Sequence, residues 1–333
     1  MQIIKKIFVK LFDYVLKIIE KSNSAYITIH KRPMLAIDVK TESDQLKYLP
    51  LVGIVLQGLI LEQDDFTLET IRVYIKHYPL AKIILSTWEG QDISRFRAEG
   101  IVVVLSKKPE TSGISNVNYQ IVSAQAGVLQ ANELGCKYVL KTRTDQRMYA
   151  TNAIEYLLNL IKTFPIGVNC KQNERIVACG FNSFKNRLYG FSDMFYFGNT
   201  EDMLVYWSVA LDQRDPVQIK KLHDSNLSLL EYAKTEAVEV YLTANYLRAI
   251  GRDLQWTLKD SLQKYAEHFC FVDQESLDIY WPKYSNKEYR WLAYDKKDNP
   301  YEQIGFKDWF NLYVDLDNKI SFNEEYIATD LAR

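Results

Sequence analysis

Residues 138–145 read YVLKTRTD. The apolar start of this stretch predicts a buried β-strand, and its charged end follows the carboxyl end of that strand, where open α/β sheets hold their ligands. Asp145 is a candidate ligand for a divalent cation. Lys141, Arg143 and Arg147 supply positive charge that suits phosphate. The stretch therefore indicates a site for a nucleotide diphosphate, although charges that pair with one another in a surface turn would have the same sequence.

Strands and helices alternate around this stretch. Apolar runs predict strands over residues 51–57, 82–87, 101–105 and 138–141. The spacing of apolar residues, with capping and stop residues at the ends, predicts helices over residues 67–77, 92–99 and 119–134. This order predicts an α/β fold, with a doubly wound, mostly parallel sheet that is flanked by helices and joined by right-handed crossovers.

The carboxyl ends of parallel strands meet at one edge of a sheet, so the residues at these ends should converge. Beside the cluster of residues 141–147 they are Gln57, Gly58, Thr87 and Trp88. Asn118 and Gln120 begin the long predicted helix, and their amides could reach the same edge, although Asn118 could instead cap the helix. No G-x-G-x-x-G follows the first strand and no P-loop motif is present, so neither of those phosphate-binding sites is indicated.

The pattern changes after residue 150. Helices are predicted over residues 153–162, from Thr200 to about Leu211, and from Tyr232 to Ile250. Residues 191–198 contain an aromatic strand, with Asp193 just before it. Glu236 and Glu239 lie three residues apart in the last of these helices, so they should share a face. These carboxylates are the further acidic candidates.

The first 21 residues form a basic amphipathic pattern. Apolar residues recur at helical spacing, and five lysines stand largely between them, against Asp13 and Glu20. The apolar runs are shorter than the roughly 20 residues that cross a bilayer. Residues 1–21 therefore predict a helix that lies on an anionic membrane surface, or one that docks on its own domain or on a second copy in a homodimer.

The composition is that of an ordinary soluble globular chain of 333 residues, enough for one large or two modest domains. The net charge of −1 gives no reason to expect binding to nucleic acid. Four cysteines form no C-x-x-C pair and no secretory signal is visible, so a cytoplasmic location is expected. The four histidines are scattered, which argues against zinc, although His223 and His268 are candidates to complete a metal shell.

The sequence resembles the WavE family of lipopolysaccharide-synthesis proteins. The blocks that carry the resemblance are VLKTRTD at 139–145, ILSTWEG at 84–90, GIVVVLSKKP at 100–109, N-x-Q-I-V-S with a later glycine at 118–127, SDMFYFG at 192–198 and a glutamate-bearing helix at 236–239. The first and the fifth are the most specific. The resemblance implies a glycosyltransferase domain of the A-type (GT-A) fold over residues 45–255. A basic helix precedes it over residues 1–24, and an aromatic-rich extension packs on it over residues 256–333.

In that fold a D-x-D motif after the fourth strand holds Mn²⁺ or Mg²⁺ on the pyrophosphate of the donor. Here Arg143 occupies the first acidic position and Asp145 the second. Asp145 could hold the metal together with donor oxygens and water, because Mg²⁺ needs few protein carboxylates. Alternatively, Arg143 could replace part of the charge of the metal by binding the pyrophosphate itself. The resemblance favours a metal, with Asp145 as its ligand.

The resemblance also implies roles for the other candidates. The donor-binding set is Gln57, Gly58, Thr87, Trp88, Asn118, Gln120, Lys141, Arg143 and Arg147. The catalytic candidates are Asp193, as a general base for the acceptor hydroxyl, and then Glu239 and Glu236. Plainer interpretations stand beside these: Trp88 as core filler, Arg147 in a surface ion pair, Asp193 as a turn residue, and the two glutamates as solvated side chains.

The expected function is transfer of a sugar from a nucleotide-sugar donor to a lipid-linked or growing cell-surface glycan, at the inner face of the plasma membrane. Two alternatives remain. A nucleotidyltransferase on a similar sheet usually has a basic, glycine-rich loop after the first strand, whereas residues 57–60 read QGLI. A non-catalytic assembly protein on a degenerate transferase fold would explain the missing first carboxylate.

Overall fold

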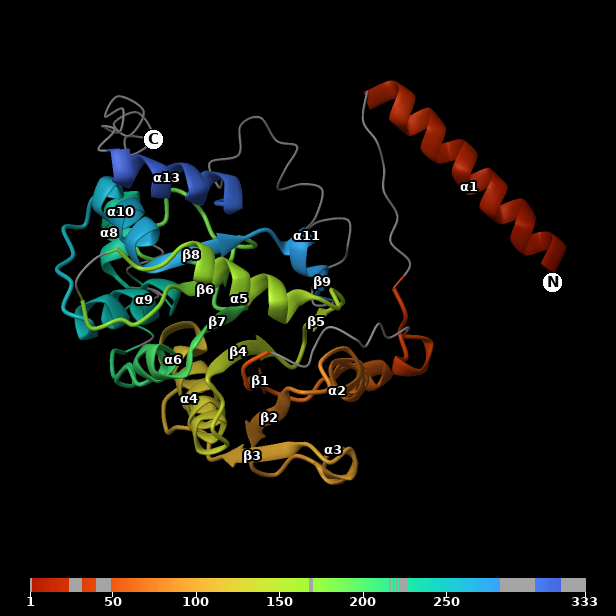
Figure 1. The fold of residues 1–333 in the computed structure, drawn as a ribbon, viewed down its shortest axis with the longest axis horizontal. Helices are drawn as coiled ribbons and strands as arrows, with labels where there is room; N and C mark the ends of the chain where they lie inside the picture. The colour runs from red at the N-terminus through yellow and green to blue at the C-terminus, as the bar shows by residue number, and fades with distance from the viewer. Residues whose placement is uncertain are drawn as a thin grey trace. The chain divides into compact units, whose positions relative to one another are not determined.

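The computed structural model describes residues 2–23, 32–39, 49–167, 170–215, 217, 219, 221, 227–236, 238–281 and 303–318. The chain divides into two units, Met1–Met34 and Leu35–Arg333. The larger unit contains the sheet and the candidate site, and the smaller unit contains the N-terminal helix (Figure 1).

The strands of the larger unit are β1 (Val52–Gln57), β2 (Lys82–Trp88), β3 (Val102–Ser106), β4 (Tyr138–Arg143), β5 (Arg147–Met148), β6 (Ile176–Cys179), β7 (Tyr196–Asn199), β8 (Phe269–Val272) and β9 (Ile279–Tyr280). Within the described ranges, seven of them form one sheet in the order β3-β2-β1-β4-β7-β6-β8, and β5 pairs with β9. β1 to β4 run parallel, as do β6 and β8, whereas β7 is antiparallel to both of its neighbours. The predicted α/β class with a mostly parallel sheet is confirmed.

The α-helices of the larger unit are α2 (Phe66–His77), α3 (Ser94–Ala98), α4 (Val117–Glu133), α5 (Ala153–Thr163), α6 (Thr200–Trp207), α8 (Leu229–Lys234), α9 (Val238–Ala249), α10 (Leu258–His268), α11 (Gln274–Leu277) and α13 (Phe306–Asn318). Short 3-10 turns are η1 (Ala36–Asp38), η3 (Gln63–Asp65) and η4 (Ile114–Asn116). β1 and β2 run between α2 and α4 (Figure 1). Because helices cover both of its faces, β1 is buried along its whole length.

Gly127 allows α4 to lie close to the sheet. A Cβ added at this position would lie 2.3 Å from Cγ1 of Val55 and 3.1 Å from Cβ of Ser86. Both neighbours are buried residues, one in β1 and one in β2. The missing side chain therefore sets the distance between the helix and the two strands.

The helix predicted from Tyr232 to Ile250 is in fact two helices, and this corrects the sequence prediction. α8 ends and α9 begins on either side of Glu236, whose φ is 48°. Carbonyl oxygens at the end of a helix need partners from outside the helix. Arg214 supplies them, because its guanidinium donates to the carbonyl of Thr235 and, over 2.8 Å, to that of Glu236.

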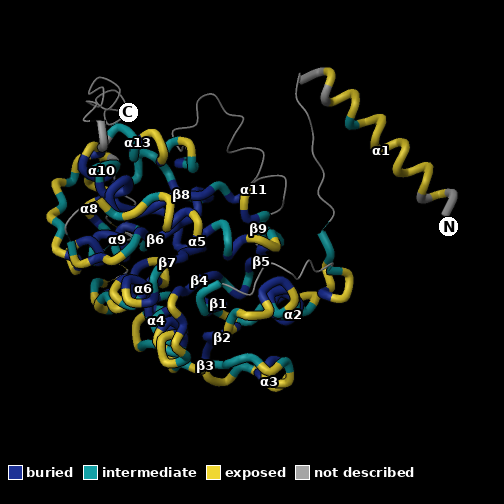
Figure 2. Tube along the Cα trace, in the orientation of Figure 1, coloured by how far each residue is buried: buried dark blue, intermediate teal, exposed yellow. Residues whose placement is uncertain are grey.

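The segment after residue 255 contributes to the main sheet. α10 leads directly into β8, which pairs in parallel with β6 at the edge of the sheet. α13 packs on α10 and β8, and its Trp309 is fully buried. Tyr265, Phe269, Phe271 and Trp309 therefore belong to the core. In Figure 2, β8 has the colour of buried residues. The boundaries proposed for the three parts of the chain stay predictions.

α1 (Gln2–Asn23) is the helix of the smaller unit. Its apolar side chains are exposed, for example Ile4 at 61% and Phe8 at 66%, and most of the helix has the colour of exposed residues in Figure 2. Among the described residues, no helix combines the length and the apolarity that crossing a bilayer requires. An amphipathic helix is therefore present, and what its apolar face contacts stays a prediction.

Candidate functional site

The candidate site lies where the strand order of the sheet reverses. The chain runs from β1 outward to β2 and β3, and then returns to β4 on the other side of β1. The parallel register pairs Gln57, at the end of β1, with Arg143, at the end of β4. Open α/β sheets bind ligands outside the carboxyl ends of their strands at such a point. The fold thus brings together two of the ends that the sequence predicts to meet.

The loops after β1 and β4 are joined by hydrogen bonds. The N–H of Thr144 donates to the carbonyl of Gln57 over 3.1 Å, and its hydroxyl donates to the carbonyl of Leu59. The hydroxyl of Thr67, in the first turn of α2, donates to the carbonyl of Thr144 over 2.9 Å. Gly58 has a φ of 126°, and a Cβ there would lie 3.0 Å from the Thr144 hydroxyl. The junction is therefore a fixed support for the charged residues on either side of Thr144.

Arg143 and Asp145 bind each other on this support. Nε and Nη2 of Arg143 donate to Oδ1 and Oδ2 of Asp145 over 2.8 and 2.9 Å. Trp281, which follows β9, donates its indole N–H to Oδ2 of Asp145 over 3.1 Å. The ring of Trp281 also lies 5.5 Å from the guanidinium carbon of Arg143. The charged side chains are 23% and 22% exposed, so solvent screens the pair only in part.

Asp193 brings a second carboxylate to Arg143. Its Oδ2 lies 3.8 Å from Nη1 of Arg143, and the residue is 7% exposed. Lys141 is fully buried beside it, where Nζ donates to the backbone carbonyl of Asp193 over 2.5 Å and lies 4.9 Å from the ring centre of Trp207. Burial lowers the pKa of Lys141 to about 7, an effect that Asp193 opposes and Arg143 reinforces. Lys141, predicted to contact phosphate, thus holds Asp193 from within the core.

Glu239 stands in the first turn of α9, within electrostatic reach of Asp193. Nη1 of Arg187 lies 3.3 Å from Oε1 of Glu239. Burial raises the pKa of Glu239, Arg187 lowers it, and Asp193 raises it further. The structure therefore brings together three of the predicted residues, Asp193, Glu239 and Arg143, and adds Arg187 to them.

Glu236 does not share a helix face with Glu239, which corrects the sequence prediction. It lies before α9 in a left-handed conformation and pairs with Arg248, whose Nη2 lies 2.5 Å from Oε1 of Glu236. The spacing of three residues implies a common face only within one continuous helix, and the chain breaks the helix at this point. Glu236 is therefore a partly exposed ion-pair partner outside the cluster.

The residues predicted to hold the nucleoside are engaged in contacts with their neighbours. Gln57 donates to a serine hydroxyl of α4 over 2.8 Å, and the hydroxyl of Thr87 donates to the carbonyl of Gly58 over 2.8 Å. Trp88 is 4% exposed and packs edge to face on Tyr119, with ring centroids 5.6 Å apart. This arrangement agrees with the interpretation of Trp88 as core filler. Donor binding by Gln57, Gly58 and Thr87 stays a prediction.

The side chain of Asn118 is buried and binds other segments of the chain, so it does not cap α4. Its amide donates to the carbonyls of Thr111 and Asp212, and its oxygen accepts the Asp212 N–H over 2.7 Å. The residue before α4 is Asn116. Gln120 is partly buried, and its Oε1 has no hydrogen-bond partner among the described residues. Of these two amides, only that of Gln120 keeps an unused polar atom.

Arg147 links β5 to α2. Nε donates to the hydroxyl of Thr70 over 2.9 Å, and Nη2 donates to the carbonyl of Phe66 over 3.1 Å. The residue is 2% exposed. The guanidinium is therefore not at the surface, as the interpretation as a surface ion pair requires, and it fixes the start of α2. Phosphate binding by Arg147 stays a prediction.

Asp145 is not presented as an open metal ligand. Both of its oxygens accept hydrogen bonds, from Arg143 and from Trp281. Within the described ranges, no group of three or more His, Cys, Asp or Glu side chains could hold a metal ion. Both ring nitrogens of His268 are hydrogen-bonded to other side chains, and His223 lies outside the described residues. Mn²⁺ or Mg²⁺ at Asp145 stays a prediction, and the ion would have to share the carboxylate with Arg143 and Trp281.

Sequence reasoning did not find Arg187 or Trp281. Trp281 lies 136 positions from Asp145, and no spacing rule connects them. The pairing of β5 with β9 makes the connection, because it places Tyr280 opposite Arg147 and so brings the next residue to the site. The aromatic residues after residue 279 are the sequence feature that could have pointed to Trp281.

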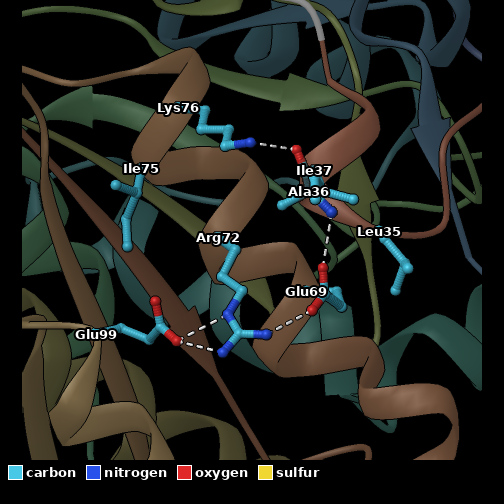
Figure 3. A pocket seen from close by; sticks show the side chains of 8 residues that line it. All are labelled: Leu35, Ala36, Ile37, Glu69, Arg72, Ile75, Lys76 and Glu99. Atoms are coloured by element: carbon cyan, nitrogen blue, oxygen red, sulfur yellow. Dashed lines mark hydrogen bonds and ion pairs between the residues drawn. The ribbon is translucent and has the colours of Figure 1, made fainter.

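A hollow of about 450 Å³ lies on another part of the larger unit (Figure 3). It is lined by Leu35, Ala36, Ile37, Glu69, Arg72, Ile75, Lys76 and Glu99. Arg72 joins Glu69 and Glu99 at 2.7 and 2.6 Å, and Lys76 donates to the carbonyl of Ala36 over 2.5 Å. The polar groups of the hollow pair with one another, and none of the predicted site residues lines it.

One family matches the chain by sequence. It is described as WavE lipopolysaccharide synthesis, and the match covers residues 52–321, which include all the candidate site residues. No curated protein matches the chain.

Solved structures are similar only at a low level. Glucosyl-3-phosphoglycerate synthase from Mycobacterium tuberculosis, in complex with Mn²⁺, UDP and phosphoglyceric acid, is 12% identical with a TM-score of 0.32; the match covers 68% of this chain and 87% of that one. A mannosyltransferase from Pyrobaculum calidifontis, in complex with GDP-Man and Mn²⁺, is 13% identical with a TM-score of 0.32, over 68% and 81% of the two chains. A CMP:2-keto-3-deoxy-manno-octonic acid synthetase with CTP is 10% identical with a TM-score of 0.32, over 53% and 84%. At these values the likeness carries no argument about function.

Proposed function

We propose that this chain, which belongs to the WavE lipopolysaccharide synthesis family, is a glycosyltransferase. It would move a sugar from a nucleotide-sugar donor to a lipid-linked or growing cell-surface glycan. The observation that carries the proposal is the approach of Arg143 to Asp193, with 3.8 Å between Nη1 and Oδ2. This approach puts a cation and a buried carboxylate side by side at the switch point of the sheet.

Glycosyl transfer with inversion of configuration uses both kinds of group. The nucleotide diphosphate leaves with growing negative charge, which a fixed cation stabilises. The acceptor hydroxyl must lose its proton, which a carboxylate base accepts when the reaction inverts the configuration of the sugar. Arg143 suits the first task and Asp193 the second. The charge of the diphosphate could be neutralised by Arg143 itself or, as the sequence predicts, by a divalent cation on Asp145.

Asp193 is the first choice for the base, and Glu239 is the alternative. Asp193 is the carboxylate nearer to the predicted leaving group, because its Oδ2 faces Arg143. Glu239 faces Arg187 instead. Burial raises the pKa of Glu239, and a carboxylate with a raised pKa is a stronger base than an exposed one.

The amphipathic helix α1 supports a place at the inner face of the plasma membrane. A lipid-linked acceptor lies in that surface, and a basic helix with exposed apolar residues suits an anionic bilayer interface. Attachment through α1 would bring the candidate site to the membrane that contains the acceptor. A second copy of the chain, joined through the same helix, is the competing partner.

An assay with the purified chain tests the proposed activity. The chain is incubated with a panel of nucleotide sugars and with lipid-linked glycan from cells that lack it, and the release of free nucleotide is measured. We expect release from one donor, dependent on the acceptor, and loss of release in Asp193→Asn. Consumption of a nucleoside triphosphate with release of pyrophosphate would identify a nucleotidyltransferase instead. No turnover of any donor would favour a non-catalytic assembly protein.

A further inference from the structure

We infer that Arg143 binds the pyrophosphate of the donor directly, in the place that a metal ion occupies in D-x-D glycosyltransferases. Asp145 then acts as a positioning residue for Arg143 and not as a metal ligand. This inference rests on the proposed function and specifies how the same site recognises its donor.

The guanidinium of Arg143 is fixed on several sides. Asp145 accepts from Nε and Nη2, over 2.8 and 2.9 Å, which sets the plane of the group. Trp281 lies 5.5 Å from the guanidinium carbon, and Asp193 lies 3.8 Å from Nη1. A cation held in this way needs little reorganisation when negative charge develops beside it, which is the condition for electrostatic catalysis.

The carboxylate of Asp145 is committed to protein donors. Oδ1 accepts from Arg143, and Oδ2 accepts from both Arg143 and Trp281. A metal at this position would share the carboxylate with the bidentate pair, and it would place a dication beside an arginine. A guanidinium avoids this cost, because it is a planar cation with several N–H donors and can bind a carboxylate and phosphate oxygens at the same time.

The position of Arg143 in the strand also suits this role. It is the last residue of β4, opposite Gln57 at the end of β1, so its side chain projects from the edge where ligands of α/β sheets bind. The hydrogen bonds of Thr144 to Gln57 and Leu59 hold the following loop. The two backbone ends at the switch point therefore support this arginine together.

The test compares nucleoside diphosphates with the matching monophosphates in titration calorimetry. UDP and UMP, GDP and GMP, dTDP and dTMP, and CMP are titrated into the full chain with EDTA, and then with Mn²⁺. The variants are Arg143→Met, Arg143→Lys and Asp145→Asn. Arg72→Met is the matched control, because Arg72 is also paired with carboxylates but lines the hollow away from the site. Circular dichroism and the melting temperature check that each variant is folded.

We expect one diphosphate to bind the EDTA-treated chain about tenfold or more tightly than its monophosphate, the effect of hydrogen bonds to a charged group. Arg143→Met should abolish this preference and leave the affinity for the monophosphate unchanged. Arg143→Lys should keep part of it, since a lysine binds phosphate as a point charge. Asp145→Asn should weaken the preference without making it dependent on metal, and Arg72→Met should leave it intact.

Other outcomes would overturn the inference. A preference for the diphosphate that needs Mn²⁺, survives in Arg143→Met and is lost in Asp145→Asn would restore the metal site, and the proposed function would still stand. Binding of CMP alone would also keep the proposed function, but CMP-sugars carry no pyrophosphate for Arg143. A chain that binds none of the nucleotides under either condition would overturn both the inference and the proposed function.

Discussion

Asp193 and Glu239 are two acidic residues with different neighbours. Asp193 lies 3.8 Å from a guanidinium nitrogen of Arg143, whereas Glu239 lies 3.3 Å from one of Arg187. Only the first contact joins a carboxylate to the cation that we assign to the leaving group. The two residues therefore form a natural comparison for locating the base.

Asp193→Asn should lower kcat for sugar transfer about 10²- to 10⁴-fold, the range expected for loss of a general base. Glu239→Gln should lower it less than about tenfold, because Glu239 acts only through its effect on Asp193. Initial rates of nucleotide release measure both variants, with nucleotide affinity as the control for binding. A larger loss in Glu239→Gln than in Asp193→Asn would move the base to Glu239.

Lys141 predicts a dependence of stability on pH. Its pKa falls from 10.5 to about 7 on burial. Below about pH 7 the folded and unfolded chains both carry this proton, whereas between about pH 7 and 10 only the unfolded chain does. The contribution of Lys141 to the free energy of unfolding therefore rises with pH across this window, by up to about 1.4 kcal/mol per pH unit.

Urea unfolding of the wild type and of Lys141→Met at pH 7 and pH 9 measures this contribution. The free energy of unfolding of the wild type, minus that of the variant, should grow by on the order of 1–2 kcal/mol between the two pH values. Other titrating groups cancel in the difference, since both proteins contain them. A difference that does not change with pH would mean that Lys141 ionises in the folded chain as it does in water.

The first four strands followed the local sequence pattern, whereas the helix predicted from Thr200 to about Leu211 ends at Trp207. The apolar runs before Gln57 and Arg143 became buried strands, since each run is long enough to cross the core. The single helix expected around Glu236 is interrupted there, and no local sequence pattern predicts the interruption. Arg214 lies 21 residues before Thr235, outside α8, and its donors satisfy the carbonyls at the end of that helix.

The packing of α4 on β1 and β2 depends on the absence of a side chain at Gly127. Gly127→Ala should destabilise the chain by about 1–3 kcal/mol, the usual cost of overpacking a core. The added methyl group would meet Val55 at 2.3 Å, and the helix would have to move away from β1. Gly167→Ala is the control, because no atom lies near its Cβ, and it should change stability by less than about 0.5 kcal/mol. Equal urea midpoints for the two variants would contradict this account of the contact.

The whole molecule combines a candidate site that the topology assembles with a helix in a separate unit. The meeting of Gln57 and Arg143 could be predicted, because parallel strands place their carboxyl ends at one edge. The contact between Trp281 and Asp145 could not, since it depends on the pairing of β5 with β9 across more than a hundred residues. The burial of Lys141 could not be predicted either, because a lysine in a charged cluster is usually a surface residue.

The attachment of the whole chain to a membrane is tested by sedimentation with vesicles. Lys6 and Lys10 lie four residues apart on α1, so they share its polar side. Reversing both charges, as Lys6→Glu with Lys10→Glu, should weaken binding to anionic vesicles at least roughly thirtyfold, because each lysine near such a surface contributes about 1 kcal/mol and each new glutamate is repelled. Lys107→Glu with Lys108→Glu changes the net charge equally at exposed positions outside α1 and should have little effect.

Equal binding by the two double variants would show that the attraction is not specific to α1. Failure of the wild type to bind vesicles, together with a dimeric mass in light scattering, would instead assign the apolar face of α1 to a second copy of the chain. Either result would leave the assignments at Arg143 and Asp193 unchanged, because those residues belong to the other unit.

The position of Trp281 makes its fluorescence useful for observing this protein. Its indole ring lies against the guanidinium of Arg143 and its N–H is bonded to Asp145, so the emission of the ring depends on charges within the candidate site. A phosphate bound by Arg143 would change the charge beside the ring, and with it the intensity or wavelength of the emission. On the proposed role of Arg143, the fluorescence of Trp281 would therefore change when the donor binds, and stopped-flow spectroscopy would follow this change without a label.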